Sequence, residues 1–356
     1  MLAKPVSSTC NLRCEYCYYA GKNKLLHLEN SRMSQDILEV FTRQSLDMHG
    51  RDAVVEFAWH GGEPLIAGIP FYQEALKLQR KFGKGRIILN TLQTNATLLT
   101  DEWCRFFKAN DFLIGVSIDG PEPLHNAYRK TADGQGSFTK TMRGIELLQK
   151  HGVSFNTLTT VNRKNMEQPL SVYRFLRELT DYMQFLPVVE GVPTQYETED
   201  GQLFTVPPGI HSVKTIYPLT DFSVTAEGYG TFLCAIWDEW NQHDSEKKHI
   251  QLFDVTIGNL RGIPSSLCVH NPLCGHSGCV EVNGDVYACD RYAFPAYRLG
   301  NITRTSLGEL MQQNRNFGMH KSYGLPEECF DCQYIKLCFG GCPKDRLWDN
   351  KNYLCT

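Results

Sequence analysis

The sequence lacks the features of several large classes of protein. Its 356 residues contain no run of about 18 uncharged apolar residues, the length that a membrane-spanning helix needs. The 36 Lys and Arg residues do not outnumber the 39 Asp and Glu residues, so no basic excess favours nucleic-acid binding. The first residues, MLAKPVSSTCNLRC, contain no apolar core of a secretory signal, and no internal repeat occurs. We therefore expect a cytoplasmic protein that contacts neither a membrane nor nucleic acid.

Cysteine, by contrast, is abundant and clustered. Three of the 14 cysteines are Cys10, Cys14 and Cys17, and nine lie between Cys268 and Cys355. Thiols in the cytoplasm are kept reduced, so binding of a metal or an iron-sulfur cluster explains these groups better than disulfides do. The sequence thus predicts two centres of chemistry, separated by a long segment with few cysteines.

This middle segment alternates between strand-like and helix-like patterns. Strands are expected at 54–59, 86–89, 112–118, 153–161 and 182–189, and helices at 70–83, 101–108 (capped by Thr100), 137–152, 170–179 and 225–240. Repeated strand-helix units predict an α/β fold with a parallel sheet or barrel and helices outside it. Residues 190–221 show no period and are expected to form a long surface insertion.

Polar segments follow several of these strands. His60 to Pro64, Gln93 to Asn95 and Ser117 to Gly120 are small, polar or rich in glycine. The carboxyl ends of parallel strands form the ligand site in such folds. These segments therefore suit a backbone that approaches a polar cofactor.

The first motif has the spacing Cys10-x3-Cys14-x2-Cys17. Three thiolates suit a [4Fe-4S] cluster with one iron left open, since each other iron takes one cysteine. A structural zinc ion is the alternative, although it normally needs a fourth ligand. Together with Tyr16 and the later Gly61-Gly62-Glu63-Pro64 turn, the motif resembles the radical S-adenosylmethionine (SAM) superfamily.

The resemblance extends from Lys4 to Cys355 and is narrower than a superfamily: the sequence resembles the anaerobic sulfatase-maturating enzymes. It is carried by Lys4-Pro5, the cysteine loop with Asn11, Leu12, Tyr16 and Tyr19, Trp59-His60-Gly61-Gly62-Glu63-Pro64, Leu92-Gln93-Thr94-Asn95, and Val116-Ser117-Ile118-Asp119-Gly120-Pro121 with His125 and Arg129-Lys130. It implies SAM contacts at Tyr16, Gly62, Ser117, Arg129 and Val189. The alternatives are ordinary strand-end polarity for Ser117, a solvated loop charge for Arg129 and simple packing for Val189.

The C-terminal cysteines form the second group. Their number allows two four-cysteine clusters, and two zinc knuckles are the alternative. The array resembles the SPASM extension of peptide-modifying radical SAM enzymes, which implies three [4Fe-4S] clusters in all. The implied ligand sets are Cys268, Cys274, Cys289 and Cys342 for one auxiliary cluster, and Cys329, Cys332, Cys338 and Cys355 for the other. Cys104 and Cys234 are expected to be small core residues, and Cys279 has no place in this scheme.

Asp290 directly follows the expected cluster ligand Cys289. A carboxylate beside a cluster ligand stays near the active cavity, which suits a general base. The resemblance implies that Asp290 accepts a proton from the substrate. An exposed loop charge is the alternative.

The resemblance also implies an activity. A flavodoxin or ferredoxin-like donor would reduce the N-terminal cluster, SAM would be cleaved to methionine and 5'-deoxyadenosine, and a cysteine or serine of an unfolded sulfatase polypeptide would become Cα-formylglycine. The auxiliary clusters would accept the remaining electron. Two alternatives stay open: another SPASM reaction, such as thioether or carbon-carbon crosslinking, and a non-catalytic iron-sulfur or zinc scaffold.

The implied architecture is a partial (β/α)6 radical SAM barrel followed by a cysteine-rich SPASM domain. We expect a core at 1–224, a linking helical segment at 225–265 and the SPASM domain at 266–356. Members of the family continue beyond the position of Thr356 with a helical segment, so a truncated C-terminal end is expected.

Overall fold

The computed structural model describes residues 1–28, 32–192, 196–197, 203–204, 218–347 and 350–355. It divides the chain into two compact units. The first comprises Met1–Ser117, Arg129–Phe155 and Ser277–Asn314, and the second comprises Ile118–Tyr128, Asn156–His276 and Arg315–Thr356. No helix among the described residues is long and apolar enough to cross a membrane.

The first unit is built on a mixed sheet. Its strands lie in the order β12-β11-β10-β1-β2-β3-β4. They are β1 (Leu2–Ala3), β2 (Val55–Trp59), β3 (Ile88–Thr94), β4 (Leu113–Ser117), β10 (Cys279–Val280), β11 (Asp285–Tyr287) and β12 (Arg298–Asn301). Strands β10, β1, β2, β3 and β4 run parallel, whereas β11 and β12 are antiparallel to their neighbours. The parallel part confirms the fold class expected from the repeated strand-helix pattern.

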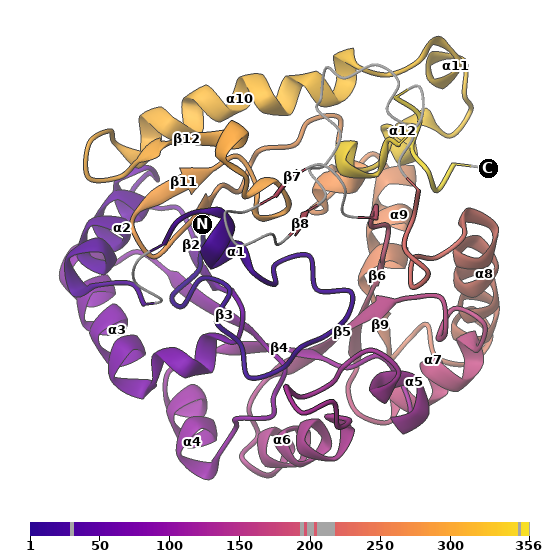
Figure 1. Ribbon diagram of the computed structural model, residues 1–356, viewed down its shortest axis with the longest axis horizontal. Coiled ribbons are helices and arrows are strands. Elements are labelled where there is room, and N and C mark those ends of the chain that lie inside the picture. The colour runs from indigo at the N-terminus through magenta and orange to yellow at the C-terminus, as the bar shows by residue number, and fades with distance from the viewer. Residues whose placement is uncertain (29–31, 193–195, 198–202, 205–217, 348–349, 356) are drawn as a thin grey trace. The chain divides into compact units, whose positions relative to one another are not determined.

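Helices cover one side of these parallel strands. They include α2 (Gln35–Asp47), α3 (Ile69–Gly83), α4 (Asp101–Ala109) and α6 (Phe138–Lys150). Figure 1 shows α2, α3 and α4 along the outer side of β2, β3 and β4. Thr100 accepts a hydrogen bond from Trp103 N at the start of α4, which confirms the predicted cap. The polar segments at the C-terminal ends of these strands are therefore the candidate ligand site.

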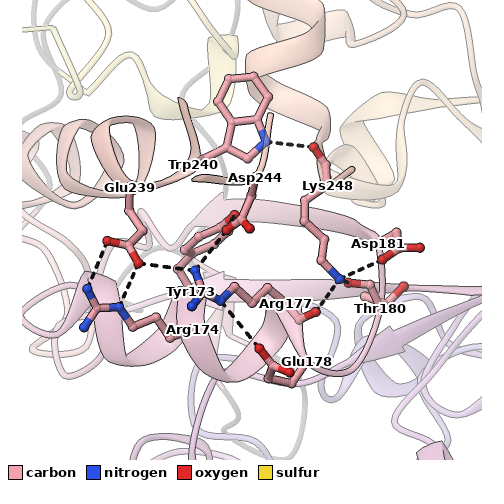
Figure 2. Close-up of polar contacts among 10 residues, drawn as sticks. All are labelled: Tyr173, Arg174, Arg177, Glu178, Thr180, Asp181, Glu239, Trp240, Asp244 and Lys248. Atoms are coloured by element: carbon pink, nitrogen blue, oxygen red, sulfur yellow. Dashed lines mark hydrogen bonds and ion pairs between the residues drawn. The ribbon is translucent and has the colours of Figure 1, made fainter. Parts of the chain in front are cut away.

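The second unit contains the parallel strands β5 (Phe155–Val161), β6 (Tyr182–Pro187) and β9 (His249–Ile250). Helices α7 (Pro169–Arg177) and α8 (Ala226–His243) are joined by the ionic network of Figure 2, in which Arg174 and Arg177 both bind Glu239. Arg177 also binds Asp244 at 2.9 Å. Because these groups are partly exposed, we expect the network to contribute little to stability.

The remaining helices are mostly short. They are α1 (Lys22–Leu25), α5 (Glu122–Asn126), α9 (Gln251–Leu260), α10 (Leu307–Tyr323), α11 (Glu327–Phe330) and α12 (Ile335–Cys338). The expected insertion at 190–221 falls largely outside the described residues, which there include only the short strands β7 (Tyr196–Glu197) and β8 (Leu203–Phe204) between Val192 and Pro218.

Two sequence predictions are wrong in detail. The strand expected at 86–89 is β3, which extends to Thr94, because buried Asn90 is paired with Trp59 Nε1 and with the Gln79 amide at 2.9 Å each. A polar residue can occupy a buried strand position when its hydrogen bonds are satisfied. Cys104 is buried as expected, but Cys234 is exposed.

The exposure of Cys234 follows from the period of α8. The buried residues of that helix are Tyr229, Phe232, Ile236 and Trp240, spaced three or four residues apart along one face. Cys234 lies between two of these positions and therefore points away from the core.

Candidate active site

The N-terminal cysteines lie in the loop between β1 and α1. Cys10 and Cys17 are exposed and Cys14 is half-buried. Leu12 N–H donates to Cys10 Sγ at 3.3 Å, and Asn95 Nδ2 approaches the same sulfur at 3.8 Å. Desolvation raises the pKa of the Cys10 thiol to about 12, and the nearby Glu63, Cys14 and Cys17 act in the same direction.

These observations test whether the loop suits an iron-sulfur cluster. Among the described residues, no group of three or more His, Cys, Asp or Glu side chains is arranged as a site for a metal ion. The fit therefore rests on the donors: three neighbouring thiols, with N–H groups directed at one sulfur, match the thiolates and hydrogen bonds that such clusters use.

Glu63 connects three of the sequence motifs. Its buried carboxylate accepts hydrogen bonds from Leu65 N at 3.0 Å, Thr94 Oγ1 at 2.8 Å and Asn95 N at 2.9 Å. Burial raises the pKa of Glu63 to about 7, and these hydrogen bonds oppose that shift. Asn95 Nδ2 donates in turn to Asn11 Oδ1 at 3.0 Å. The chain Glu63-Asn95-Asn11 thus links the Gly-Gly-Glu-Pro turn and the end of β3 to the cysteine loop.

Gly62 is required at its position by the same loop. A Cβ atom there would lie 2.1 Å from the Thr9 carbonyl oxygen, and Gly62 N donates to Ser7 O at 2.6 Å. The turn therefore packs directly against the backbone that leads into Cys10.

The expected SAM contacts are placed as follows. Tyr16 and Arg129 are buried together in the first unit, with the guanidinium carbon 5.5 Å from the ring centroid. The burial of Arg129 argues against a solvated loop charge. Ser117, at the end of β4, accepts a hydrogen bond from Gln93 Nε2 at 3.0 Å. Val189 belongs to the second unit, where it is buried just after β6.

Asp290 lies in a ring of polar groups within the first unit. Its Oδ2 atom accepts a hydrogen bond from Tyr18 at 2.6 Å and lies 3.9 Å from Lys4 Nζ. Burial would raise the pKa of Asp290, but the charges of Lys4 and Arg291 and the hydrogen bond from Tyr18 act in the opposite direction, and the pKa is lowered. The carboxylate is only one-fifth exposed, so it is not an ordinary loop charge.

Lys4 and His60 complete this ring. Lys4 is fully buried, and its Nζ lies 3.4 Å from His60 Nδ1. Gly61 N–H also donates to His60 Nδ1, at 2.8 Å. Burial and the Lys4 charge lower the pKa of His60 to about 3. The imidazole is therefore neutral, with its proton on Nε2.

A buried polar layer lies behind Lys4. The ammonium sits 3.9 Å from the centroid of the Tyr19 ring, and the Tyr19 hydroxyl donates to the Glu281 carboxylate. Cys279, which has no place among the expected ligands, is fully buried in β10 and lies 4.0 Å from the same hydroxyl.

Sequence reasoning missed the roles of Lys4, Tyr18 and His60. A signal was available for two of them, since Lys4 directly follows β1 and His60 directly follows β2, and these strands are parallel neighbours with Ala3 opposite Trp59. Residues that leave adjacent parallel strands at the same level meet at one edge of the sheet.

Several C-terminal cysteines of the second unit influence one another's pKa. Desolvation raises the pKa of Cys329 and of Cys355. The Cys338 thiol raises both pKa values further, and the Cys332 thiol raises that of Cys355. Burial lowers the pKa of Lys321 to about 8, and the thiols of Cys268, Cys274 and Cys342 oppose that shift. Cys289 belongs to the first unit.

The chain is similar to known protein families and to several known proteins. Residues 5–176 match the radical SAM superfamily, and residues 274–333 match an iron-sulfur cluster-binding domain named SPASM. The chain is 44% identical to a serine-type anaerobic sulfatase-maturating enzyme of Bacteroides thetaiotaomicron over 367 residues, covering all of this chain and 86% of that protein. It is 34% identical to a cysteine-type anaerobic sulfatase-maturating enzyme of Clostridium perfringens, covering all of this chain and 93% of that protein.

Solved structures give the same result. The fold resembles native anSMEcpe with bound AdoMet, with a TM-score of 0.84 and 32% identity, over 99% of this chain and 93% of that one. It resembles equally the form with bound AdoMet and the Cp18Cys peptide, with a TM-score of 0.84 over 99% and 92% of the two chains.

Proposed function

The chain belongs to the anaerobic sulfatase-maturating enzymes, and from this premise we propose how its residues convert a peptidyl cysteine or serine of a sulfatase to Cα-formylglycine. It is a radical SAM oxidoreductase that uses SAM and [4Fe-4S] clusters. The observation that carries the residue-level proposal is the carboxylate of Asp290, held beside Lys4 and Tyr18 and directly after Cys289.

Cys10, Cys14 and Cys17 would hold the cluster that leaves one iron open, and Tyr16, Gly62, Ser117, Arg129 and Val189 would contact SAM. When bound and reduced, this cluster would supply the electron for cleavage of SAM to methionine and a 5'-deoxyadenosyl radical, and that radical would take a hydrogen atom from Cβ of the target residue. The Tyr16 and Arg129 pair supports this assignment, because it buries a cation beside the loop that carries Cys14 and Cys17.

Asp290 is proposed as the acceptor of the substrate thiol or hydroxyl proton. A thiol with a pKa of about 8.5 would lose its proton to an ordinary carboxylate only at a cost of about 6 kcal/mol. The lowered pKa of Asp290 keeps it ionised and makes this cost larger still. Proton transfer must therefore accompany hydrogen abstraction, which makes the substrate more acidic.

Cys268, Cys274, Cys289 and Cys342 are proposed to bind one auxiliary cluster, and Cys329, Cys332, Cys338 and Cys355 the other. We assign the core to 1–224, the linking segment to 225–265 and the SPASM domain to 266–356. The substrate would be an unfolded sulfatase polypeptide in the cytoplasm, and the electron donor a flavodoxin or ferredoxin-like protein.

The decisive experiment is anaerobic reconstitution followed by mass spectrometry of two sulfatase-motif peptides that differ only in cysteine or serine at the target position. Formation of the same aldehyde from either peptide, together with 5'-deoxyadenosine, supports the proposal. A thioether or carbon-carbon crosslink would assign the chain to another SPASM reaction. If the reduced protein does not cleave SAM, the remaining hypothesis is a non-catalytic iron-sulfur or zinc scaffold.

A further inference from the structure

Lys321 is a fully buried lysine near the C-terminal end of α10, in the second unit. Its Nζ donates to the backbone oxygens of Cys268 at 2.6 Å, Val269 at 3.0 Å and Asn271 at 2.5 Å. An ammonium group has three N–H donors, so all of them are used by this one loop. Lysine is rarely buried, because removing its charge from water is costly unless other polar groups replace the water.

The end of α10 holds the same loop at two further points. A Cβ atom on Gly318 would lie 2.1 Å from the Cys274 carbonyl oxygen, so the helix backbone packs directly against that cysteine. Cys274 N–H donates to Gly318 O at 3.4 Å, and Ser322 Oγ donates to Pro272 O at 2.5 Å. Residues 268–274 are therefore held along their length by a single turn of helix.

The charge of Lys321 is not balanced by a carboxylate. Within the described part of the chain, its polar contacts are the three carbonyl groups, and no Asp or Glu forms an ion pair with it. Its Nζ contacts the backbone of Cys268 directly at 2.6 Å, and the side chains that would act on its charge if ionised are those of Cys268, Cys274 and Cys342. These three cysteines are proposed ligands of one auxiliary cluster, whose thiolates would supply the missing negative charge.

We propose that Lys321 is a positioning residue that sets the reduction potential of the auxiliary cluster bound by Cys268 and Cys274. The inference rests on the ligand set of the proposed function. The potential of an iron-sulfur cluster depends on nearby charge and hydrogen bonds. A buried cation stabilises the more negative, reduced state, so Lys321 would make this cluster a better electron acceptor.

The test is a redox titration followed by electron paramagnetic resonance, without SAM or peptide. The full-length chain carries Cys10→Ala, Cys14→Ala and Cys17→Ala, which leaves the two auxiliary clusters. Lys321→Gln removes the charge but keeps amide donors, Lys321→Arg keeps the charge, and Ser322→Ala is the matched control that removes one uncharged contact to the same loop.

We expect Lys321→Gln to lower the potential of one cluster only. At the potential where that cluster is half reduced in the parent, the ratio of reduced to oxidised cluster should fall about tenfold, a shift of about 59 mV for one electron. Lys321→Arg and Ser322→Ala should stay within about threefold of the parent. If Lys321→Gln instead loses about four iron atoms, Lys321 is needed to hold the cluster, and the proposal that it sets the potential is overturned.

An unchanged potential in Lys321→Gln, or an equal change in Lys321→Gln and Lys321→Arg, would overturn the proposal. Failure of the proposed function gives a different result. If formylglycine is not made, the titration is unaffected because it involves no turnover. If the cysteines bind zinc, the parent protein itself shows no iron-sulfur signal.

Discussion

At the scale of single residues, Asp290 is the side chain on which the chemistry depends most directly. Asp290→Asn keeps its shape and removes the proton acceptor. Iron content, SAM binding and 5'-deoxyadenosine formation should be retained, while formylglycine falls by on the order of 100-fold, within the range of general-base contributions. Quantitative mass spectrometry of both products checks this. If Asp290→Asn forms formylglycine at a rate close to that of the parent, another residue of the site must be the base.

Lys4 is the second residue whose role can be isolated. Lys4→Met removes the buried cation that lies between Asp290 and His60. We expect formylglycine formation to fall by about tenfold or more while SAM cleavage continues, because the proton acceptor loses its charged partner. The ratio of 5'-deoxyadenosine to formylglycine should therefore rise. Lys4→Arg should restore part of the coupling, and equal losses of both products would indicate a merely structural role.

At the scale of elements, the Gly-Gly-Glu-Pro turn and the cysteine loop form one packed structure. Gly62→Ala places a methyl group against the Thr9 carbonyl and should displace the backbone next to Cys10. We expect a loss of about four iron atoms, the content of one [4Fe-4S] cluster, and loss of SAM cleavage. Gly50→Ala is the matched control, since no atom lies within 4 Å of its Cβ position. Full iron content in Gly62→Ala would contradict this coupling.

Helix α4 offers a prediction about stability alone. Thr100 Oγ1 accepts the hydrogen bond of Trp103 N at 3.3 Å. Thr100→Ala should lower the free energy of unfolding by about 1 kcal/mol, the usual value of an N-cap. Denaturant unfolding measures the change, and formylglycine formation at low temperature should not alter. A loss of activity without a loss of stability would show that α4 acts on the site.

At the scale of the whole molecule, the cysteines predict the cofactor content. The reconstituted protein should contain about twelve iron atoms, or three four-iron clusters. Changing Cys10, Cys14 and Cys17 together to alanine should leave about eight and abolish SAM cleavage. Iron and sulfide analysis checks the number. SAM cleavage by the triple variant would refute the assignment of the N-terminal cluster.

The sequence by itself determined the features that depend on neighbouring residues. The spacing of Cys10, Cys14 and Cys17, the strand-helix repeats and the Thr100 cap are all local patterns, and each indicates its structure without knowledge of the rest of the chain. The family resemblance rests on the same short motifs. The structure confirmed the parallel strands and the cap that these patterns predict.

Only the tertiary structure decided which side chains are buried together. It placed Lys4 against Asp290 although 286 positions separate them, satisfied Asn90 within a strand, and exposed Cys234. It also enclosed Lys321 in a loop of carbonyl groups. The physical reason is that the cost of burying a polar or charged group depends on partners that distant segments supply. Composition and periodicity alone therefore predict that such polar residues lie on the surface.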